Sequence, residues 1–126
     1  MGKGAAPQAV AFPRRGAVYL VDFDPVRGSE LGKTRPAVVL QNDIANRWSS
    51  VTIVAGITSK VGAKLYPSEV LLKAGEGGLT VDSCVQLNQV RTVDKTRLVR
   101  RLGSLTPSTV QLVERALKVS FGLIPT

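Results

Sequence analysis

The sequence predicts a mainly β fold with one C-terminal helix, arranged as a small, twisted and partly closed antiparallel barrel. Its 126 residues suffice for one domain with a hydrophobic core and are too few for two. About five to seven short apolar runs, separated by turn-forming residues, have the length and spacing of strands. One longer helical pattern follows them near the C-terminus, and such a helix can cover one face of a curved sheet.

The N-terminal segment and the first strand differ in composition. Residues 1–13 are small, proline-containing and aperiodic, so we expect a disordered tail followed by a single domain over residues 14–126. Residues 17–23 are rich in β-forming side chains and apolar on both faces, which predicts a buried strand. Asp24-Pro25 ends this strand.

The later β elements follow the same alternation of apolar runs and turns. After loop 24–34, strands are expected at residues 35–41, 51–59, 69–73, 84–91 and 98–105, with short turns or one-turn helices at 42–48 and 93–97. In the strand over 51–59, alternation places Thr58 on the same face as Gly56. The missing side chain of Gly56 leaves room there for something to approach.

The C-terminal helix has clear start and stop signals. Thr106 supplies an N-cap hydroxyl, Pro107 suits the first helical position, and Gly122 ends the pattern. Between them lies a broad apolar stripe, made of Val110, Leu112, Val113, Ala116, Leu117 and Val119.

Composition limits the kinds of partner and chemistry. The 17 basic and 9 acidic residues give a net charge of +8, which favours a polyanionic partner such as nucleic acid or an acidic protein segment. No apolar run approaches the ~20 residues of a membrane-spanning helix. The N-terminus lacks the apolar core of a signal peptide, so we expect a cytoplasmic protein with no membrane contact. Cys84 stands alone, which excludes an intramolecular disulfide, and is expected to be a small buried residue.

The chain contains no histidine. Histidine-pair catalysis, the serine–histidine–carboxylate triad and the usual zinc-ligand sets are therefore excluded. Any catalysis must use carboxylates, arginine, lysine, tyrosine or hydroxyl groups, and we expect no cofactor.

The segment Gly28 to Pro36 is the candidate functional stretch. Two glycines, Glu30 and Arg35 directly precede an apolar run, so Arg35 lies where a loop meets a strand. Loops held by a rigid sheet often carry binding and catalytic groups. The alternative is a solvated hairpin loop in which Arg35 forms an ion pair with Glu30 or Asp24.

Several segments together make the chain resemble the MazF/PemK toxin family of endoribonucleases from toxin–antitoxin pairs. The resemblance covers roughly residues 14–123. The matching segments are Arg15-Gly16-Ala17-Val18-Tyr19, Gly28-Ser29-Glu30, Thr34 to Asn42, Ile57-Thr58-Ser59, Asp82-Ser83, Gln89 to Lys95 and Arg97-Leu98. Their order and spacing, more than any single segment, carry the match.

The resemblance implies an SH3-like barrel with a C-terminal helix, assembled as a homodimer. The implied activity is metal-independent, sequence-specific cleavage of single-stranded RNA, leaving a 2′,3′-cyclic phosphate and a 5′-hydroxyl. An acidic MazE-like antitoxin is the implied protein partner, and the net charge of +8 suits it.

The resemblance also implies roles for individual residues. Arg35 and Thr58 match the catalytic arginine and threonine of the family. Because arginine stays protonated in proteins, Glu30 is our candidate for the group that accepts the 2′-hydroxyl proton. Positions that match RNA-contacting residues are Ser29, Ser59 and Gln89.

Other side chains are expected at the RNA because of their charge or aromatic ring. A phosphate groove is expected to involve Lys60, Lys64, Arg91 and Arg97. Tyr66 and Trp48 are candidates for stacking on bases, although a place in the core or a dimer interface is the favoured expectation for Trp48.

Two other functions remain open from the sequence. The CcdB toxins share this barrel and poison gyrase, but they have no need of the Arg35 and Thr58 pair. A non-catalytic barrel that binds single-stranded RNA would suit the charge and the aromatic residues, and its binding would depend steeply on salt.

Overall fold

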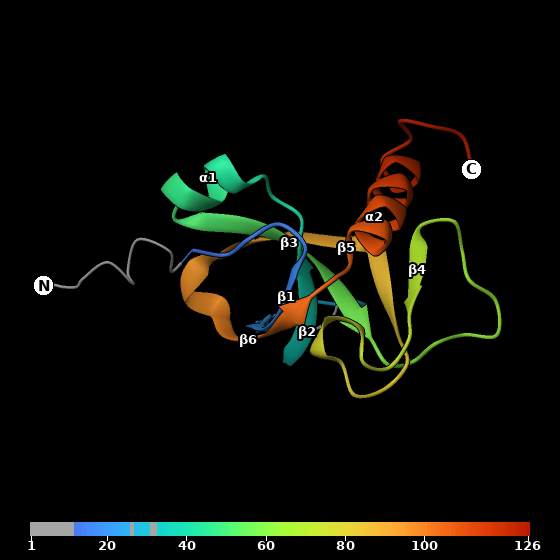
Figure 1. Ribbon diagram of the computed structural model, residues 1–126, viewed down its shortest axis with the longest axis horizontal. Coiled ribbons are helices and arrows are strands. Elements are labelled where there is room, and N and C mark those ends of the chain that lie inside the picture. Colours follow the sequence, from blue (N-terminus) through green and yellow to red (C-terminus); the bar gives the residue numbers. More distant parts are fainter. Residues whose placement is uncertain (1–11, 26, 31–32) are drawn as a thin grey trace, which may run out of the picture.

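The computed structural model describes residues 12–25, 27–30 and 33–126 (Figure 1). Its elements are, in chain order, β1 (Ala17–Asp22), β2 (Thr34–Val39), α1 (Asp43–Trp48), β3 (Val51–Thr58), β4 (Glu69–Leu72), the 3-10 turn η2 (Glu76–Gly78), β5 (Ser83–Asp94), the 3-10 turn η3 (Lys95–Arg97), β6 (Leu98–Ser104) and α2 (Pro107–Ser120). The predicted mainly β fold with a C-terminal helix is confirmed.

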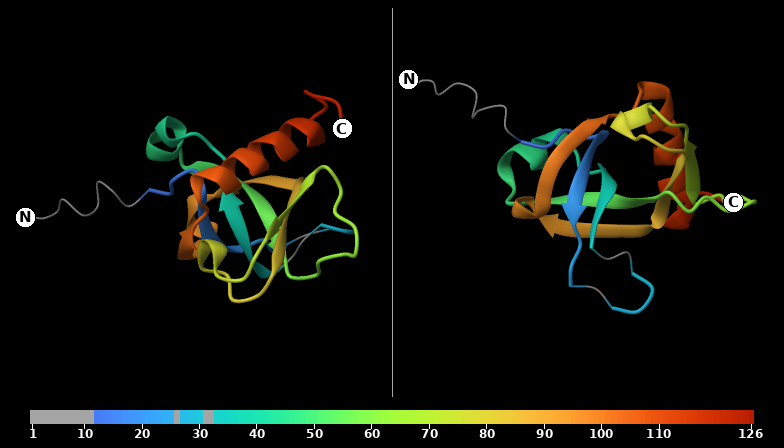
Figure 2. Two further views of the ribbon diagram at one scale, coloured as in Figure 1. Left: turned by 45° about the vertical axis from the view of Figure 1, so that its right-hand side comes forward. Right: turned by 90° about the horizontal axis from the view of Figure 1, so that it is seen from below.

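All strands belong to one antiparallel, six-stranded sheet in the order β4-β5-β3-β2-β1-β6. The sheet curls strongly around itself, and α2 lies across one of its open ends (Figure 2). Within the described residues, β4 and β6 are edge strands, so no ladder closes the barrel. The predicted partly closed antiparallel barrel therefore agrees with the observed sheet.

Both faces of the central strands are buried, because the curled sheet encloses two apolar clusters. In β1, Val18 belongs to the cluster under α2, whereas Val21 belongs to the second cluster. In β2, Val38 and Val39 divide in the same way. This explains why these strands read as continuous apolar runs in the sequence instead of alternating apolar and polar residues.

The cap predicted at Thr106 forms, and side chains also cap α1 and η3. The Asn42 side chain accepts a hydrogen bond from Ala45 N at the start of α1, and the Asp94 side chain accepts one from Thr96 N at η3. Thr106 caps α2 and Pro107 occupies its first turn. Each cap satisfies an N–H group that the first helical turn leaves unpaired.

The structure corrects several sequence-based expectations. The predicted tail lies outside the described residues as far as residue 11, but Pro13 is buried and so belongs to the folded domain. Trp48 is 76% exposed on α1, which rules out the core and leaves the dimer interface as the remaining expectation for it. Leu112 is 56% exposed, which makes the buried stripe of α2 narrower than predicted. No helix within the described residues has the length and apolarity to span a membrane.

Candidate functional site

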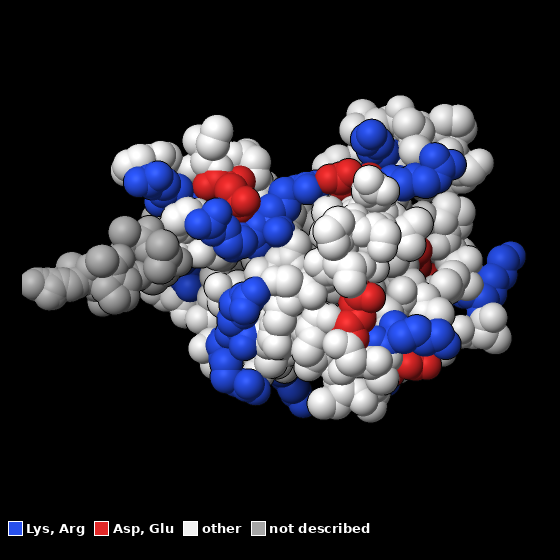
Figure 3. Space-filling model, in the orientation of Figure 1, with Lys and Arg blue, Asp and Glu red and all other residues white. Residues whose placement is uncertain are grey.

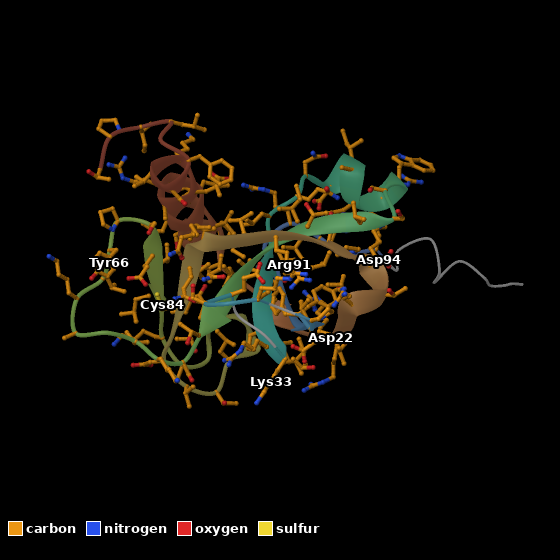
Figure 4. The ribbon with its side chains drawn as sticks, turned by 180° about the vertical axis from the view of Figure 1, so that it is seen from behind. Asp22, Lys33, Tyr66, Cys84, Arg91 and Asp94 are labelled. Carbon is orange, nitrogen blue, oxygen red and sulfur yellow. The ribbon has the colours of Figure 1, made fainter. Side chains whose placement is uncertain are left out.

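The loop between β1 and β2 is fixed at its base by hydrogen bonds. The N–H of Phe23 donates to the carbonyl of Lys33 at 2.9 Å, and the N–H of Lys33 donates to Asp24 Oδ1 at 2.7 Å. Arg91 Nη1 of β5 donates to the Phe23 carbonyl at 2.6 Å, with the guanidinium 5.7 Å from the centre of the Phe23 ring. Figure 4 shows Arg91 above the place where Asp22 and Lys33 bracket this loop.

Arg97 contacts the base of the same loop. Its Nη1 donates to the Asp22 carbonyl at 3.0 Å and also to the Asp24 carbonyl. Arg91 and Arg97 were expected to line a phosphate groove. Instead, the structure directs both guanidiniums to main-chain carbonyls at the end of β1, and only Arg91 also lines a cavity.

A cavity of about 260 Å³ lies under this loop. We call it the loop cavity. Gln89 Nε2 lies 3.5 Å from the Ser29 carbonyl and links β5 to the loop across the cavity wall. The structure thus brings together four residues predicted at the site, Ser29, Glu30, Gln89 and Arg91. The full lining is Phe23, Ser29, Glu30, Gly56, Asn88, Gln89, Val90 and Arg91.

A large bulge in β5 turns amide side chains toward the loop cavity. The pairing of β3 with β5 passes from Ala55↔Val90 to Ile57↔Val85, so residues 86–89 lie opposite the single residue Gly56. Bulges re-aim side chains and are common beside active sites. Asn88, which the sequence did not single out, reaches the cavity in this way. Adjacent polar residues at 88 and 89 were the available signal, because a regular strand would alternate.

Arg35 and Thr58 come from neighbouring strands. The register of β2 and β3 pairs Ala37 with Gly56, and continuing it by two residues places Arg35 opposite Thr58. Residues opposite each other in an antiparallel pair share a face, so both lie on the face of Gly56, which lines the loop cavity. Thr58 is 7% exposed, and its Oγ1 accepts a hydrogen bond from Lys60 N at 3.1 Å. That bond uses a lone pair of the hydroxyl and leaves its proton to be donated.

A second, larger cavity of about 450 Å³ adjoins Arg35. We call it the Arg35 cavity. Ser59, another predicted site residue, lines it together with Arg35 and Pro36. The predicted residues are therefore divided between two cavities, the loop cavity beside Gly56 of β3 and the Arg35 cavity at the start of β2.

The remaining predicted residues lie outside these two cavities or at their edge. Glu30 is exposed at the rim of the loop cavity, and its Oε1 accepts a hydrogen bond from Arg27 N at 2.6 Å. Lys60 and Lys64 are exposed and line neither cavity. Tyr66, 62% exposed, lies on the loop before β4 and away from Arg91 (Figure 4).

Two further observations bear on the chemistry. Burial, assisted by the nearby charge of Glu69, raises the pKa of the Cys84 thiol to about 11, so this thiol is protonated at neutral pH and is no nucleophile. Within the described residues, no three His, Cys, Asp or Glu side chains form a group that could hold a metal ion. Guanidinium, hydroxyl and amide groups dominate the site, and these bind anions and the polar edges of bases.

Comparisons with known proteins agree with this geometry. A family model described as PemK-like, MazF-like toxin of type II toxin–antitoxin system matches residues 14–121. The crystal structure of MazF from Deinococcus radiodurans (Form-I) is similar, with a TM-score of 0.75 and 29% identity over 88% of this chain and 97% of that one. The MazE-MazF structure (Form-II) from the same organism has a TM-score of 0.69 and 26% identity over 88% and 96% of the two chains.

A third similar structure is an endoribonuclease in complex with its cognate antitoxin from a mycobacterial species. Its TM-score is 0.73 at 24% identity, over 90% of this chain and 99% of that chain. At this identity the similarity establishes a shared fold.

Proposed function

The chain belongs to the family of PemK-like, MazF-like toxins of type II toxin–antitoxin systems, and we propose that it is an endoribonuclease that cleaves single-stranded RNA without a metal ion. The observation that carries this proposal is the pairing of Ala37 in β2 with Gly56 in β3, because continuing it by two residues sets Arg35 and Thr58 opposite each other. The MazF and endoribonuclease structures of similar fold support it.

In the proposed reaction the 2′-oxygen of the RNA attacks the adjacent phosphorus. Its proton passes to a base, the bond from phosphorus to the 5′-oxygen breaks, and that oxygen takes up a proton. The products are a 2′,3′-cyclic phosphate and a 5′-hydroxyl. Negative charge builds up on the two non-bridging phosphate oxygens, and the planar guanidinium of Arg35 can bind both at once.

Thr58 and Glu30 complete the proposed catalytic group. The Thr58 hydroxyl already accepts a bond from Lys60 N, so its proton can be donated to a phosphate oxygen or orient the 2′-hydroxyl. Glu30 is the carboxylate on the rim of the loop cavity, and it is our candidate for the base, acting directly or through water.

The polar groups around the loop cavity are suited to RNA recognition. Bases of a single strand can be splayed out and read along their edges by amides and hydroxyls. We propose this role for Ser29, Gln89 and, beyond Arg35, Ser59. Lys60 and Lys64 are exposed outside the cavities, so we assign them long-range attraction of the phosphate backbone.

An acidic antitoxin is the proposed protein partner, and a homodimer is the proposed assembly. The relatives crystallised with their antitoxins support the first of these proposals. The net charge of +8 also suits an acidic segment that competes with RNA, and such binding would weaken with salt. The protein would encounter both the antitoxin and its RNA substrate in the cytoplasm, where messenger RNA is translated.

The test is to incubate the purified protein in EDTA with two long single-stranded RNAs of unrelated sequence and to map the ends of the fragments. We expect discrete cuts with cyclic-phosphate ends. Arg35→Ala should lower the rate by roughly 10²–10³, the usual effect of losing one donor to a transition-state oxyanion. Arg35→Lys is the matched control, because it keeps the charge and loses the two-point contact.

Two outcomes would contradict the proposal. Both RNAs could remain intact, or Arg35→Ala could cut as fast as the unchanged protein. The first outcome would favour a barrel that binds RNA without cutting, or a protein target of the kind that the CcdB toxins have.

A further inference from the structure

We propose that the Arg35 cavity binds a nucleotide next to the cleaved position of the RNA, and that Arg100 of β6 is the ligand of its phosphate. The inference rests on the proposed ribonuclease function. It adds a second binding site for the RNA backbone and a residue that the sequence did not single out.

The strand register brings Arg100 to this cavity. Leu20 of β1 pairs with Pro36 of β2 on one side and with Arg100 of β6 on the other. Because directly opposed residues share a face, these three side chains form a row across the sheet. All three line the Arg35 cavity, at whose border Arg35 itself lies.

The lining has the chemistry of a nucleotide site. Its floor is apolar, with Leu20, Pro36 and Ile57 from three adjacent strands, and a base can pack on such a surface. Hydroxyls of Ser59 and Thr80 lie on its border with the two guanidiniums, and no carboxylate belongs to its described lining. Its volume of about 450 Å³ falls within the roughly 300–1,000 Å³ of small-ligand sites.

Arg100 differs from its neighbour Arg101 in what it contacts. Arg101 Nη2 donates to Ser104 Oγ at 2.6 Å, whereas no hydrogen bond or ion pair to another described residue engages the exposed Arg100 side chain. Arg101 pairs with Tyr19, so it belongs to the opposite face of the strand from Arg100. Basic side chains gather over the region of β6 in Figure 3.

The position of the cavity explains why an RNA strand would reach it. With the reacting phosphate held at Arg35, one neighbouring part of the strand lies toward the loop cavity and the other toward the Arg35 cavity. Guanidiniums bind phosphate oxygens in two-point contacts, and Arg100 would give up no contact with a described residue on binding. On this proposal the two cavities are consecutive parts of one path for the strand.

The test measures RNA affinity without cleavage. The probe is a mixed-sequence single-stranded RNA carrying 2′-O-methyl groups throughout, which cannot be cut through the 2′-oxygen, and binding is followed by fluorescence anisotropy at several salt concentrations. Loss of one phosphate contact lowers the slope of log affinity against log salt by about 0.7 for a single strand. At 0.1 M salt this slope corresponds to about five-fold weaker binding by Arg100→Gln.

Arg101→Gln is the matched control, because it removes the same charge from the same strand on the opposite face. We expect it to leave the salt slope unchanged, and we expect Arg100→Lys to keep most of the affinity. With a cleavable RNA, Arg100→Gln should raise KM and leave kcat unchanged, in contrast to Arg35→Ala. Thermal unfolding of each variant checks that the fold is kept.

Equal weakening by Arg100→Gln and Arg101→Gln would overturn the assignment, because the effect would then be general charge. Unchanged affinity of Arg100→Gln would overturn it as well, and weaker antitoxin binding by that variant would then mark the cavity as a protein site. These outcomes are separate from failure of the proposed function, because the anisotropy measurement does not depend on cleavage.

Discussion

The contact between Arg91 and the base of the β1–β2 loop allows a quantitative prediction. Arg91 Nη1 donates to the Phe23 carbonyl at 2.6 Å, and its guanidinium lies 5.7 Å from the centre of the Phe23 ring. A hydrogen bond involving a charged group contributes roughly 1.5–3 kcal/mol, and a cation–π contact at a partly exposed site roughly 0.5–1 kcal/mol. Arg91 is half-buried, and water can replace part of these contacts. We therefore expect Arg91→Met to lower the free energy of opening the loop base by about 2 kcal/mol.

This loss should open the loop base before the whole protein unfolds. Two hydrogen bonds hold the main chain of Lys33 in place: its carbonyl accepts from Phe23 N, and its N–H donates to Asp24. Because trypsin needs a free main chain at the cleavage point, it can cut after Lys33 only when the loop base opens. A change of about 2 kcal/mol raises the open population by roughly 30-fold. We therefore expect cleavage after Lys33, followed by mass spectrometry of the fragments, to accelerate by a similar factor in Arg91→Met.

Arg14→Met is the matched control for this experiment. Arg14 also lies over a phenylalanine, 4.5 Å from the centre of the Phe12 ring, but no described contact joins it to the loop. Cleavage after Lys33 should be unchanged in this variant. If Arg91→Met is cut after Lys33 no faster than the unchanged protein and yet binds RNA more weakly, Arg91 is a direct RNA ligand and our reasoning about the loop is wrong.

Two further predictions concern stability. Asn46→Ala should lower the unfolding free energy, measured in urea, by roughly 3 kcal/mol. The reason is that buried Asn46 accepts hydrogen bonds from Thr52 Oγ1 and Gln41 Nε2, and both groups would lose this acceptor. A destabilisation no larger than that of Thr52→Val would contradict this. The N–H of Thr106 lowers the pKa of the Glu76 carboxyl below its usual 4.5, so Glu76 stabilises the folded state above that pH, and the contribution is lost as the pH falls through the lowered pKa. The difference in unfolding free energy between the unchanged protein and Glu76→Ala should therefore be largest at pH 7 and shrink below pH 4.5. Glu76→Gln should show a smaller difference. A difference that stays constant with pH would refute the assignment.

The secondary structure could be predicted because its signals are local. Asn42, Asp94 and Thr106 each cap the turn that follows within three residues, and those hydrogen bonds need no distant partner. Apolar runs marked the strands for the same reason. Trp48 shows the limit of this approach. The residue type does not indicate whether a side chain on a short helix faces the core or the solvent, and only the tertiary structure shows that Trp48 is exposed.

Contacts between distant residues could not be predicted in this way. Arg91 and Arg97 were read as phosphate ligands because isolated basic residues on a basic protein usually face solvent. Their actual acceptors are main-chain carbonyls 68 to 75 positions earlier in the chain, at the end of β1. Every residue carries a main-chain carbonyl, so the sequence does not indicate which carbonyl an arginine contacts. Such an acceptor is visible only after the fold is known.

The bulge in β5 explains why the site itself was only partly predictable. The resemblance assigned roles to Arg35 and Thr58 without a physical reason for their being neighbours, and the register of β2 and β3, continued two residues beyond Ala37 and Gly56, supplies that reason. The residues opposite Gly56 could not be derived, because the four positions 86–89 face one residue and break the two-residue period on which face assignments depend. The same break turns Asn88 and Gln89 into the loop cavity, so differences in the length or composition of this bulge would change the groups presented to RNA while leaving Arg35 and Thr58 in place. Under the proposed function, base preference can therefore vary within this fold independently of the cleavage chemistry.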